Sequence, residues 1–341
     1  MNILVTGAAG FIGYHLCEKL ISQGHDVFGL DNINDYYSIA LKEQRLLNLG
    51  IDNPEEKQVT TSKIHGSSFR FVKVNLEDRE YLPKLFKENN FDAVCNLAAQ
   101  AGVRYSLENP FAYAESNLIG FLNILECCRD YKVTKLVYAS SSSIYGVNDK
   151  VPFSTEDDVD KPISLYAATK KSNELMAHAY SHLFGIKTIG IRFFTVYGPW
   201  GRPDMAMFLF TEAILNNKPL KVFNNGNLSR DFTYIDDIIE GVAAAVLDDG
   251  KAGEPLYRLY NIGNSKPVKL LDFITEIEKA TGKEAIKDYT EMQPGDVEKT
   301  WADIADFTQR YGYTPKTDVS TGVKKFVDWY TEFYNEQLKA K

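Results

Sequence analysis

Excess positive charge, long apolar runs and a leader segment are all missing from this sequence of 341 residues. With 38 Lys and Arg against 46 Asp and Glu, the formal net charge is −8, so no basic field is available to hold nucleic acid or an anionic membrane surface. No stretch approaches the roughly 18 apolar residues of a membrane-spanning helix, and no basic leader precedes an apolar run. We therefore expect a cytoplasmic protein whose anionic ligands are small molecules, held by a few arginines and backbone N–H groups.

Cysteine and histidine are too few and too poorly spaced for a disulfide framework or a metal site. The adjacent pair Cys127 and Cys128 is a poor candidate for a disulfide, and His178 and His182, four residues apart, fit a solvated or interface helix face. No metal is predicted. The four cysteines are expected to be reduced, and small buried core side chains are their simplest interpretation. They are Cys17, Cys95, Cys127 and Cys128.

Short β-branched runs alternate with longer helical patterns through the first half of the chain, which is typical of parallel βαβ units. The expected strands are residues 2–6, 27–30, 69–74, 93–96, 135–140 and 188–192, and the expected helices are 11–22, 80–89, 112–131 and 164–184. Residues 34–68 lengthen one connection and are expected to form a surface insertion. Beyond residue 197, one strand (256–261) and two helices (270–281 and 320–338) indicate a smaller C-terminal lobe.

Three glycines directly follow the first expected strand and open the first helix. Gly7, Gly10 and Gly13, with Phe11 and Ile12 between them, permit a tight turn and close backbone approach to a pyrophosphate at the helix N-terminus. Strand, turn, helix and a downstream acid agree on a Rossmann-type dinucleotide site.

The downstream acid is Asp31, which ends the second strand beside Asn32. A carboxylate there can accept ribose hydroxyl protons and repel a 2′-phosphate, so NAD is favoured over NADP. The alternative is a turn-forming Asp-Asn pair. Small side chains end the fourth strand, as a flat cofactor passing close to the backbone would require, although plain packing also explains them. The residues concerned are Leu97, Ala98 and Ala99.

Tyr166 and Lys170 stand four residues apart on an expected helix, so their side chains leave the same face. A neighbouring ammonium lowers the pKa of a phenol from its usual value of about 10, which would let Tyr166 act as a base. Alone, such a pair is more often an ordinary exposed one. Four serines at the preceding strand end favour a site instead, because strand ends in such sheets converge on the ligand. They are Ser140, Ser141, Ser142 and Ser143, and a surface serine loop is the alternative.

Together these motifs resemble the extended short-chain dehydrogenase/reductase superfamily. Four longer stretches resemble the UDP-glucuronate 4-epimerase family more narrowly: DNINDYY from Asp31, AQAGVRYS from Ala99, RFFTVYGPWGRPDM from Arg192 and RDFTYIDD from Arg230. The resemblance covers nearly the whole chain. It implies an α/β fold with a doubly wound parallel Rossmann-type sheet and a smaller C-terminal substrate-binding lobe.

The resemblance also implies roles for individual residues. Tyr166 would be the catalytic base, Lys170 its partner and a ribose ligand, and Ser141 the hydroxyl on the sugar O4. Ser142 and Ser143 would line the same pocket, Thr195 and Arg202 would meet the hexuronate carboxylate, and Arg230 the diphosphate. Arg104 and Asp296 are further expected substrate-binding residues, and Asn75, Leu76 and Ser140 complete the expected NAD site. Asn75 departs from the family, which commonly has an aspartate there, but an amide can still contact adenine.

The expected NAD-binding domain is residues 1–192, with about 231–265 returning to it, and the expected nucleotide-sugar-binding lobe is about 193–230 and 266–341. Two long helices, 112–131 and 164–184, could pair with their copies in a homodimer. That expectation rests partly on fold analogy.

The expected reaction is interconversion of UDP-glucuronate and UDP-galacturonate through a 4-keto sugar. Related dehydratases carry an Asp-Glu pair where this chain has Ser142 and Ser143, so elimination lacks its acid/base groups. Thr195 and Arg202 are expected to fix the carboxylate of the 4-keto acid against decarboxylation. One alternative is 4-epimerisation of a neutral sugar such as UDP-N-acetylglucosamine, with Arg202 an ordinary surface residue. The other is an NAD-sensing protein without catalysis.

Overall fold

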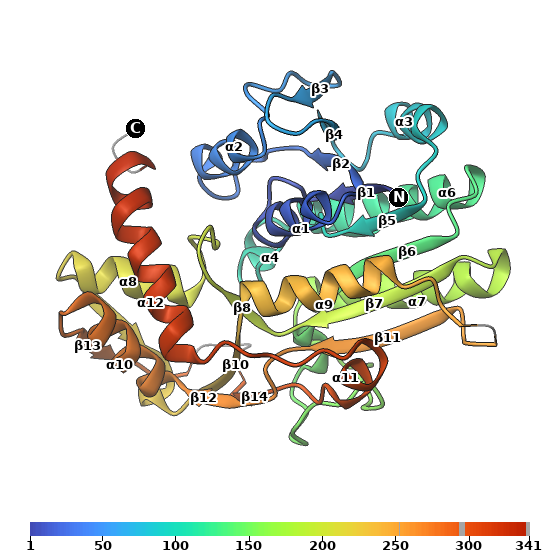
Figure 1. The fold of residues 1–341 in the computed structure, drawn as a ribbon. Helices are drawn as coiled ribbons and strands as arrows, with labels where there is room; N and C mark the ends of the chain where they lie inside the picture. The colour runs from blue at the N-terminus through green and yellow to red at the C-terminus, as the bar shows by residue number, and fades with distance from the viewer. Residues whose placement is uncertain (252, 293–296, 339–341) are drawn as a thin grey trace.

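A large, mostly parallel sheet forms the centre of the molecule in Figure 1, a computed structural model that describes residues 1–251, 253–292 and 297–338. Its strand order is β11-β7-β6-β5-β1-β2-β4-β3, and every pair is parallel except β3 with β4. The strands are β1 (Asn2–Thr6), β2 (Asp26–Asp31), β3 (Val59–Ser62), β4 (Gly66–Lys73), β5 (Ala93–Asn96), β6 (Lys135–Ser141), β7 (Lys187–Phe193) and β11 (Tyr257–Ile262). The predicted doubly wound sheet is confirmed.

Helices cover both faces of this sheet. One face carries α1 (Phe11–Ser22) and α9 (Ile235–Leu247), which pack against each other, and the other carries α3 (Tyr81–Asn89), α6 (Gly120–Asp130) and α7 (Leu165–Phe184). Each face has its own buried apolar core. Helix α7 begins where Ser164 Oγ accepts the N–H of Ala167 at 3.1 Å, and ends at Gly185 with φ +70°.

Two expectations about the helices need correction. The expected helix at 112–131 is split into α5 (Pro110–Tyr113), the π-helix η1 (Ala114–Ile119) and α6. The stretch 34–68 is not simply a surface insertion, because it contains α2 (Ile39–Asn48), whose Leu41 and Leu46 are fully buried, and the edge strand β3. The helix is short and amphipathic, and it was not predicted from the sequence.

The C-terminal part adds two small sheets beside the main one. One contains β8 (Thr195–Tyr197), β10 (Ser229–Tyr234), β12 (Pro267–Lys269) and β14 (Lys299–Thr300), and the other pairs β9 (Pro219–Val222) with β13 (Ile286–Tyr289). The helices here are α8 (Ala206–Leu215), α10 (Leu270–Thr281), α11 (Ala305–Tyr311) and α12 (Val319–Trp329), and the π-helix η4 (Tyr330–Leu338) follows α12. The chain returns to the main sheet through α9 and β11, whereas β10 pairs within the smaller sheet.

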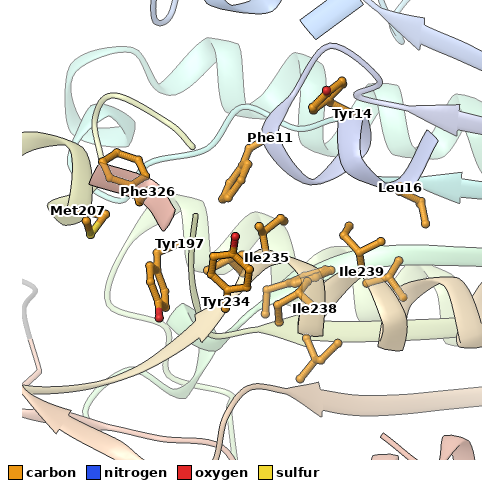
Figure 2. Packing of buried hydrophobic residues seen from close by; sticks show 14 of the residues in the cluster. Phe11, Tyr14, Leu16, Tyr197, Met207, Tyr234, Ile235, Ile238, Ile239 and Phe326 are labelled. Atoms are coloured by element: carbon orange, nitrogen blue, oxygen red, sulfur yellow. The ribbon is translucent and has the colours of Figure 1, made fainter. Parts of the chain in front are cut away.

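One apolar cluster joins the two parts, as Figure 2 shows. Phe11 at the start of α1 lies near Phe326 of α12, and Ile235 follows at the start of α9. The cluster includes Tyr14, Leu16, Tyr197, Met207, Tyr234, Ile238 and Ile239. Because these side chains are continuous, the smaller sheet is held close to the first turn of α1.

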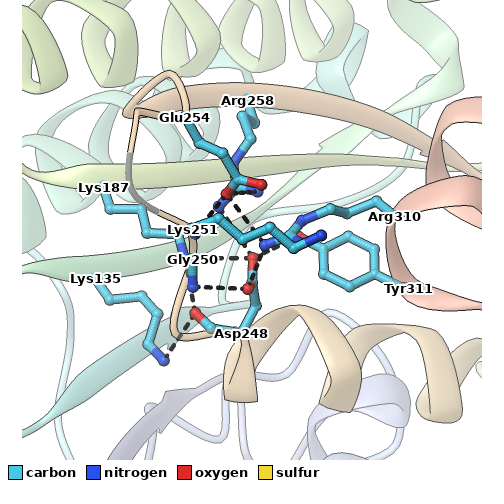
Figure 3. A network of polar contacts seen from close by, with 9 residues as sticks. All are labelled: Lys135, Lys187, Asp248, Gly250, Lys251, Glu254, Arg258, Arg310 and Tyr311. Atoms are coloured by element: carbon cyan, nitrogen blue, oxygen red, sulfur yellow. Dashed lines mark hydrogen bonds and ion pairs between the residues drawn. The ribbon is translucent and has the colours of Figure 1, made fainter.

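A charged network closes the sheet at the beginning of β7 and β11 (Figure 3). Asp248 pairs with Lys187 at 3.3 Å, Arg258 at 3.0 Å and Arg310 at 2.5 Å. Burial alone would raise the pKa of Asp248, but the N–H of Gly250 and the charges of these cations lower it well below its usual range. The network lies at the strand N-termini, the opposite edge from the ligand crevice expected in such sheets.

Candidate active site

The glycine loop after β1 is a cradle that no side chain would fit. Gly7 has φ +74°, and a Cβ there would stand 2.8 Å from the backbone nitrogen of Ala98, while a Cβ on Gly13 would stand 2.0 Å from the carbonyl oxygen of Gly7. Gly10 is the N-cap of α1 and offers no side-chain acceptor to the first turn. The loop therefore suits a pyrophosphate approaching the helix N-terminus.

Asp31 sits at the end of β2, where its carboxylate is almost fully buried. Its two oxygens accept the N–H groups of Ala9 at 3.1 Å and Ile33 at 2.8 Å, so the carboxylate is rigidly placed beside the glycine loop. Asn32 Nδ2 donates to Asn75 Oδ1 at 2.9 Å. The structure thus brings the residues predicted for ribose and adenine to one end of the sheet.

The small residues after β5 lie against the same loop. Thr6 Oγ1 accepts the N–H of Ala98 at 3.2 Å, and Leu97 and Ala99 are half-buried. Phe11 and Leu76 are buried, which suits apolar walls, and Ile12 is half-buried. The glycines leave room for a backbone-hugging cofactor, and these side chains fit the dinucleotide that the sequence predicts.

Two cations on α2 were missed by the sequence interpretation. Lys42 Nζ donates to the carbonyl and side-chain oxygens of Asn34, both at 2.6 Å. Burial lowers its pKa to about 8, and nearby Asp31 partly opposes that shift. Arg45 is fully buried. The signal was present as two cations three residues apart, but no helix was predicted at this point and no role was assigned to these residues.

Arg45 ties the glycine loop to the loop after β8. It donates to the carbonyl of Ala9 at 2.8 Å, and to the carbonyls of Trp200 at 2.6 Å and Gly201 at 3.2 Å. The hydroxyl of Tyr37 accepts a further bond at 2.8 Å. Its acceptors are all neutral oxygens. Arg45 therefore links the glycine loop to the loop after β8 through hydrogen bonds and not through an ion pair.

Tyr166 and Lys170 leave the same face of α7, as their spacing predicts, but their partners differ from expectation. Lys170 is 3% exposed and its Nζ donates to the carbonyl of Ala139 at 2.8 Å; burial lowers its pKa to about 8. Burial also raises the pKa of Tyr166, and a hydrogen bond with Ser141 and the charge of Arg202 lower it. Burial is the largest of these influences, so the pKa of Tyr166 is raised overall and Ser141 and Arg202 offset only part of the shift.

The serines after β6 divide into two groups. Ser143 donates to Ser141 Oγ from its N–H at 3.2 Å and its hydroxyl at 3.0 Å, and Ser142 starts the short 3-10 helix η2 (Ser142–Tyr145). Ser140 points elsewhere, because its hydroxyl donates to Glu174 Oε1 at 2.6 Å in the interior. The expected cofactor contact of Ser140 stays a prediction, and its hydroxyl is engaged by Glu174.

Behind the serines lies a buried polar network that the sequence interpretation did not predict. Glu174 of α7 pairs with Arg192 of β7, and Arg192 Nη1 donates to the hydroxyl of Tyr145 at 2.9 Å. That hydroxyl donates to Asn261 Oδ1 of β11 at 2.7 Å. The network links the helix of Tyr166 to three strand ends.

Arg202 and Thr195 line one narrow hollow beneath the start of α1, together with Phe11 and Met205. Arg202 is paired with Asp204, and the hydroxyl of Tyr36 donates to the same carboxylate at 3.1 Å. Asp204 and Tyr36 both fall within the family-like stretches, so a signal existed, but nothing in the spacing predicted this contact.

Arg104 and Arg230 are not among the residues that line this hollow. Arg104 is exposed and lies with its guanidinium carbon 5.0 Å from the ring centre of Phe223 in the 3-10 helix η3 (Phe223–Gly226). Arg230 donates to the carbonyls of Ser229 at 3.0 Å and Glu298 at 3.1 Å. The remaining expected substrate residue, Asp296, lies outside the described residues.

Two further observations limit the kinds of site. Among residues 1–251, 253–292 and 297–338, no group of three His, Cys, Asp or Glu side chains could hold a metal ion. In the same part of the chain, no helix is long and apolar enough to cross a membrane.

Comparison with known proteins agrees with this geometry. The profile of the family described as "NAD dependent epimerase/dehydratase family" matches residues 3–263. The chain is 52% identical to Protein CapI of Staphylococcus aureus over 98% of this chain and 100% of that protein, and 46% identical to UDP-glucuronate 4-epimerase 4 of Arabidopsis thaliana over 100% and 77%. Its fold is similar to the crystal structure of UDP-glucuronic acid 4-epimerase from Bacillus cereus in complex with UDP-glucuronic acid and NAD. That similarity has a TM-score of 0.86 and 35% identity, and covers 98% of this chain and 100% of that one.

Proposed function

Because the chain belongs to the NAD dependent epimerase/dehydratase family, we propose that it is an NAD-dependent UDP-glucuronate 4-epimerase, an isomerase that interconverts UDP-glucuronate and UDP-galacturonate. One observation carries the proposal beyond the family level. Ser141 and the charge of Arg202, the groups expected at the sugar O4 and at the sugar carboxylate, both lower the pKa of the Tyr166 phenol, which burial raises, and Arg202 lines one hollow with Thr195. The expected base and the expected carboxylate-binding cation therefore lie close enough to interact.

NAD fits the cradle of Gly7, Gly10 and Gly13 with Asp31 at the ribose, and when bound it supplies reversible hydride transfer at the sugar C4. The protein's own groups handle the proton. Tyr166 takes the proton of the C4 hydroxyl, directly or through Ser141. It returns the proton after the 4-keto sugar has rotated in the pocket to present its opposite face. Lys170, whose Nζ donates to the carbonyl of Ala139, is the residue that we propose holds the ribose.

The surroundings of the phenol support epimerisation over dehydration. The two positions that follow Ser141 carry hydroxyls, Ser142 and Ser143, and neither can act as the acid/base pair that removal of a hydroxyl group needs. Hydride return is the step left to the 4-keto sugar. Arg202 and Thr195 line one hollow and fit a hexuronate carboxylate better than a neutral hydroxymethyl group.

Incubation of the purified protein with UDP-glucuronate, without added reductant, tests the proposal. Nuclear magnetic resonance should show UDP-galacturonate accumulating to equilibrium with no net NADH. Pentose as the main product would mean decarboxylation. No turnover of UDP-glucuronate together with epimerisation of UDP-N-acetylglucosamine would contradict the hexuronate assignment, and bound NAD with no turnover of any nucleotide sugar would leave a sensing protein.

We also propose that two copies pair through α7 and the helices beside it. Apolar side chains stand in solvent there: Phe111 is 76% exposed, Leu175 60% and Leu183 66%. A patch of this kind on two adjoining helices suits burial against a second copy. Sedimentation of wild-type protein should give a dimer, and Leu175→Glu with Leu183→Glu should give a monomer. The matched control is Leu209→Glu on α8, 49% exposed, which should leave the dimer intact.

The two-part domain division and the cytoplasmic location remain proposals. Support for the first comes from the separate small sheets of the C-terminal part, with α9 and β11 returning to the main sheet. Support for the second comes from four free, buried cysteines, since such thiols persist in a reducing compartment.

A further inference from the structure

The guanidinium of Arg202 meets Asp204 along one edge, and its carbon lies 6.0 Å from the ring centre of Tyr36. Its Nε donates to Asp204 Oδ1 at 3.0 Å and its Nη2 to Asp204 Oδ2 at 2.5 Å, a two-point contact between side chains that are 23% and 32% exposed. The charge of Arg202 lowers the pKa of Asp204, although burial opposes that shift. Asp204 is therefore a carboxylate at neutral pH, fixed on the side edge of the arginine.

Asp204 is itself held by the segment that follows β2. The hydroxyl of Tyr36 donates to Asp204 Oδ2 at 3.1 Å, and the ring of Tyr36 packs 4.8 Å from that of Tyr105. Close approach is possible because Gly102, with φ +101°, has no side chain: a Cβ there would stand 2.3 Å from the Tyr36 hydroxyl. Three separate chain segments thus meet around one ion pair.

A guanidinium has five N–H groups arranged in two edges, each able to meet a carboxylate at two points. Asp204 takes one N–H on Nε and one on Nη2. Nη1 and the second N–H of Nη2 form the other edge, which a ligand carboxylate can take while Asp204 stays in place. The ion pair with Asp204 thus keeps the side chain of Arg202 ordered before the ligand binds. A long flexible side chain that is already ordered loses less entropy on binding.

We propose that Asp204, locked by Tyr36, is a positioning residue that aims the outer edge of Arg202 at the substrate carboxylate, and that it thereby decides both hexuronate affinity and product fidelity. This inference rests on the proposed function. The inference goes beyond the proposed function because it assigns a role to Asp204 and Tyr36, which need not touch the substrate.

The orientation of the carboxylate also affects which product forms, because the 4-keto hexuronate is a β-keto acid that can lose carbon dioxide. If the ring puckers so that the C5–C6 bond lies parallel to the π orbitals of the C4 carbonyl, that bond can break and its electron pair passes through C5 to the carbonyl oxygen. C6 leaves as carbon dioxide, C5 takes up a proton, and the 4-keto pentose receives the hydride back at C4. A two-point contact from an oriented arginine holds the carboxylate, and with it C6, away from this position, whereas a mobile arginine lets C6 move into it.

Asp204→Asn and Tyr36→Phe test the inference against wild type. The first removes the charge that orients Arg202, and the second deletes only the hydroxyl that holds Asp204. We expect Asp204→Asn to raise the KM for UDP-glucuronate about tenfold, the typical scale of a lost charge-assisted contact, with a smaller fall in kcat. The share of pentose product should rise in both variants, and less in Tyr36→Phe.

The matched control is Asp35→Asn, which removes the same charge from an exposed position one residue before Tyr36 and should match wild type in KM and pentose share. Thermal unfolding and NAD affinity show whether each variant is folded. If Asp204→Asn does not fold, Tyr36→Phe still tests the inference.

Unchanged KM and pentose share in the folded variants would overturn the inference. A lower KM in Asp204→Asn would also overturn it, because it would mean that Asp204 competes with the substrate for Arg202. Failure of the proposed function is seen separately, as a wild-type protein that does not epimerise UDP-glucuronate.

Discussion

Glu174 and Arg192 face each other through two parallel hydrogen bonds, from Nε to Oε1 at 2.9 Å and from Nη2 to Oε2 at 3.0 Å, and each side chain is only 2% exposed. Their pairing joins the middle of α7 to β7. Ser140 shares the same carboxylate, so the strand end that carries Ser141 is fixed relative to the helix that carries Tyr166. The relative position of base and hydroxyl is thus determined by a buried ion pair behind them.

Replacing one member of this ion pair should lower the free energy of unfolding strongly. Arg192→Met leaves the Glu174 carboxylate buried without its cation, and removal of one partner of a buried pair costs about 3–5 kcal/mol. Urea unfolding at neutral pH measures the loss. The double variant Glu174→Leu with Arg192→Met should recover part of it. The control is Lys324→Met in an exposed i,i+4 pair with Asp328, where the change should stay under about 0.5 kcal/mol. Equal losses in the two single variants would contradict the role of burial.

Tyr166→Phe should abolish nearly all epimerisation while leaving the cofactor site intact. General acid–base groups contribute roughly 10²–10⁴-fold, so kcat should fall by that factor. NAD affinity, followed by calorimetry, should change little. The control is Tyr113→Phe, whose ring lies 6.1 Å from that of Tyr166 and whose hydroxyl donates to the carbonyl of Ala101. A comparable fall in that variant would mean that ring packing, and not proton transfer, explains the loss.

Asp31→Asn should weaken NAD binding and reduce the preference of the site for NAD over NADP. The carboxylate holds the N–H groups of Ala9 and Ile33, and an amide replaces one acceptor by a donor and removes the charge that repels a 2′-phosphate. We expect the Kd for NAD to rise about tenfold or more, and the ratio of NADP to NAD Kd to fall. Asp26→Asn, at the exposed beginning of the same strand, should leave both constants unchanged. An unchanged ratio in Asp31→Asn would contradict ribose recognition by this residue.

His15 should make the protein lose stability in mild acid. Burial lowers its pKa to about 4, although its contact with the carbonyl of Pro199 at 3.1 Å opposes that shift. An unfolded histidine has a pKa of about 6.5, so between these values the unfolded chain binds a proton that the folded chain refuses. The stabilisation is present above pH 6.5 and is lost as the pH falls towards 4.

The free energy of unfolding at pH 7 and pH 4.5 should therefore differ less in His15→Asn than in wild type, by on the order of 2 kcal/mol. His65→Asn, on the turn between β3 and β4, serves as the control for simple loss of a histidine. If wild type and His15→Asn show the same pH dependence, the ring of His15 is protonated in the folded protein.

Much of the fold could be predicted because its signals are local. The glycine loop and most strands of the main sheet each depend on a few neighbouring residues, and most of their boundaries agree with the structure within a residue or two. The exceptions are β4, which begins three residues before the predicted strand at 69–74, and the edge strand β3, which was not predicted. The π-helix η1 could not be predicted, because a π-turn is built from the same apolar spacing as an α-helix and is decided by what packs on it.

Less of the site could be predicted, because side-chain partners are chosen by tertiary packing. Tyr166, Lys170 and Ser141 come together as their spacing indicates, yet Lys170 turns to a backbone carbonyl and Arg202 turns to Asp204. Such choices depend on distances between loops, which spacing along one chain does not contain. The roles assigned to these residues at the ligand remain predictions.

The contacts of Arg45 limit how far this protein could be shortened. A designer comparing it with smaller relatives would choose residues 34–68 for deletion, because the stretch is polar and lies between two strands. Without Arg45, the carbonyls of Ala9, Trp200 and Gly201 would lose a common donor, and the loops before α1 and after β8 would lose one of the contacts that hold them together. A miniature version must therefore keep α2, or replace Arg45 with another link between the two loops.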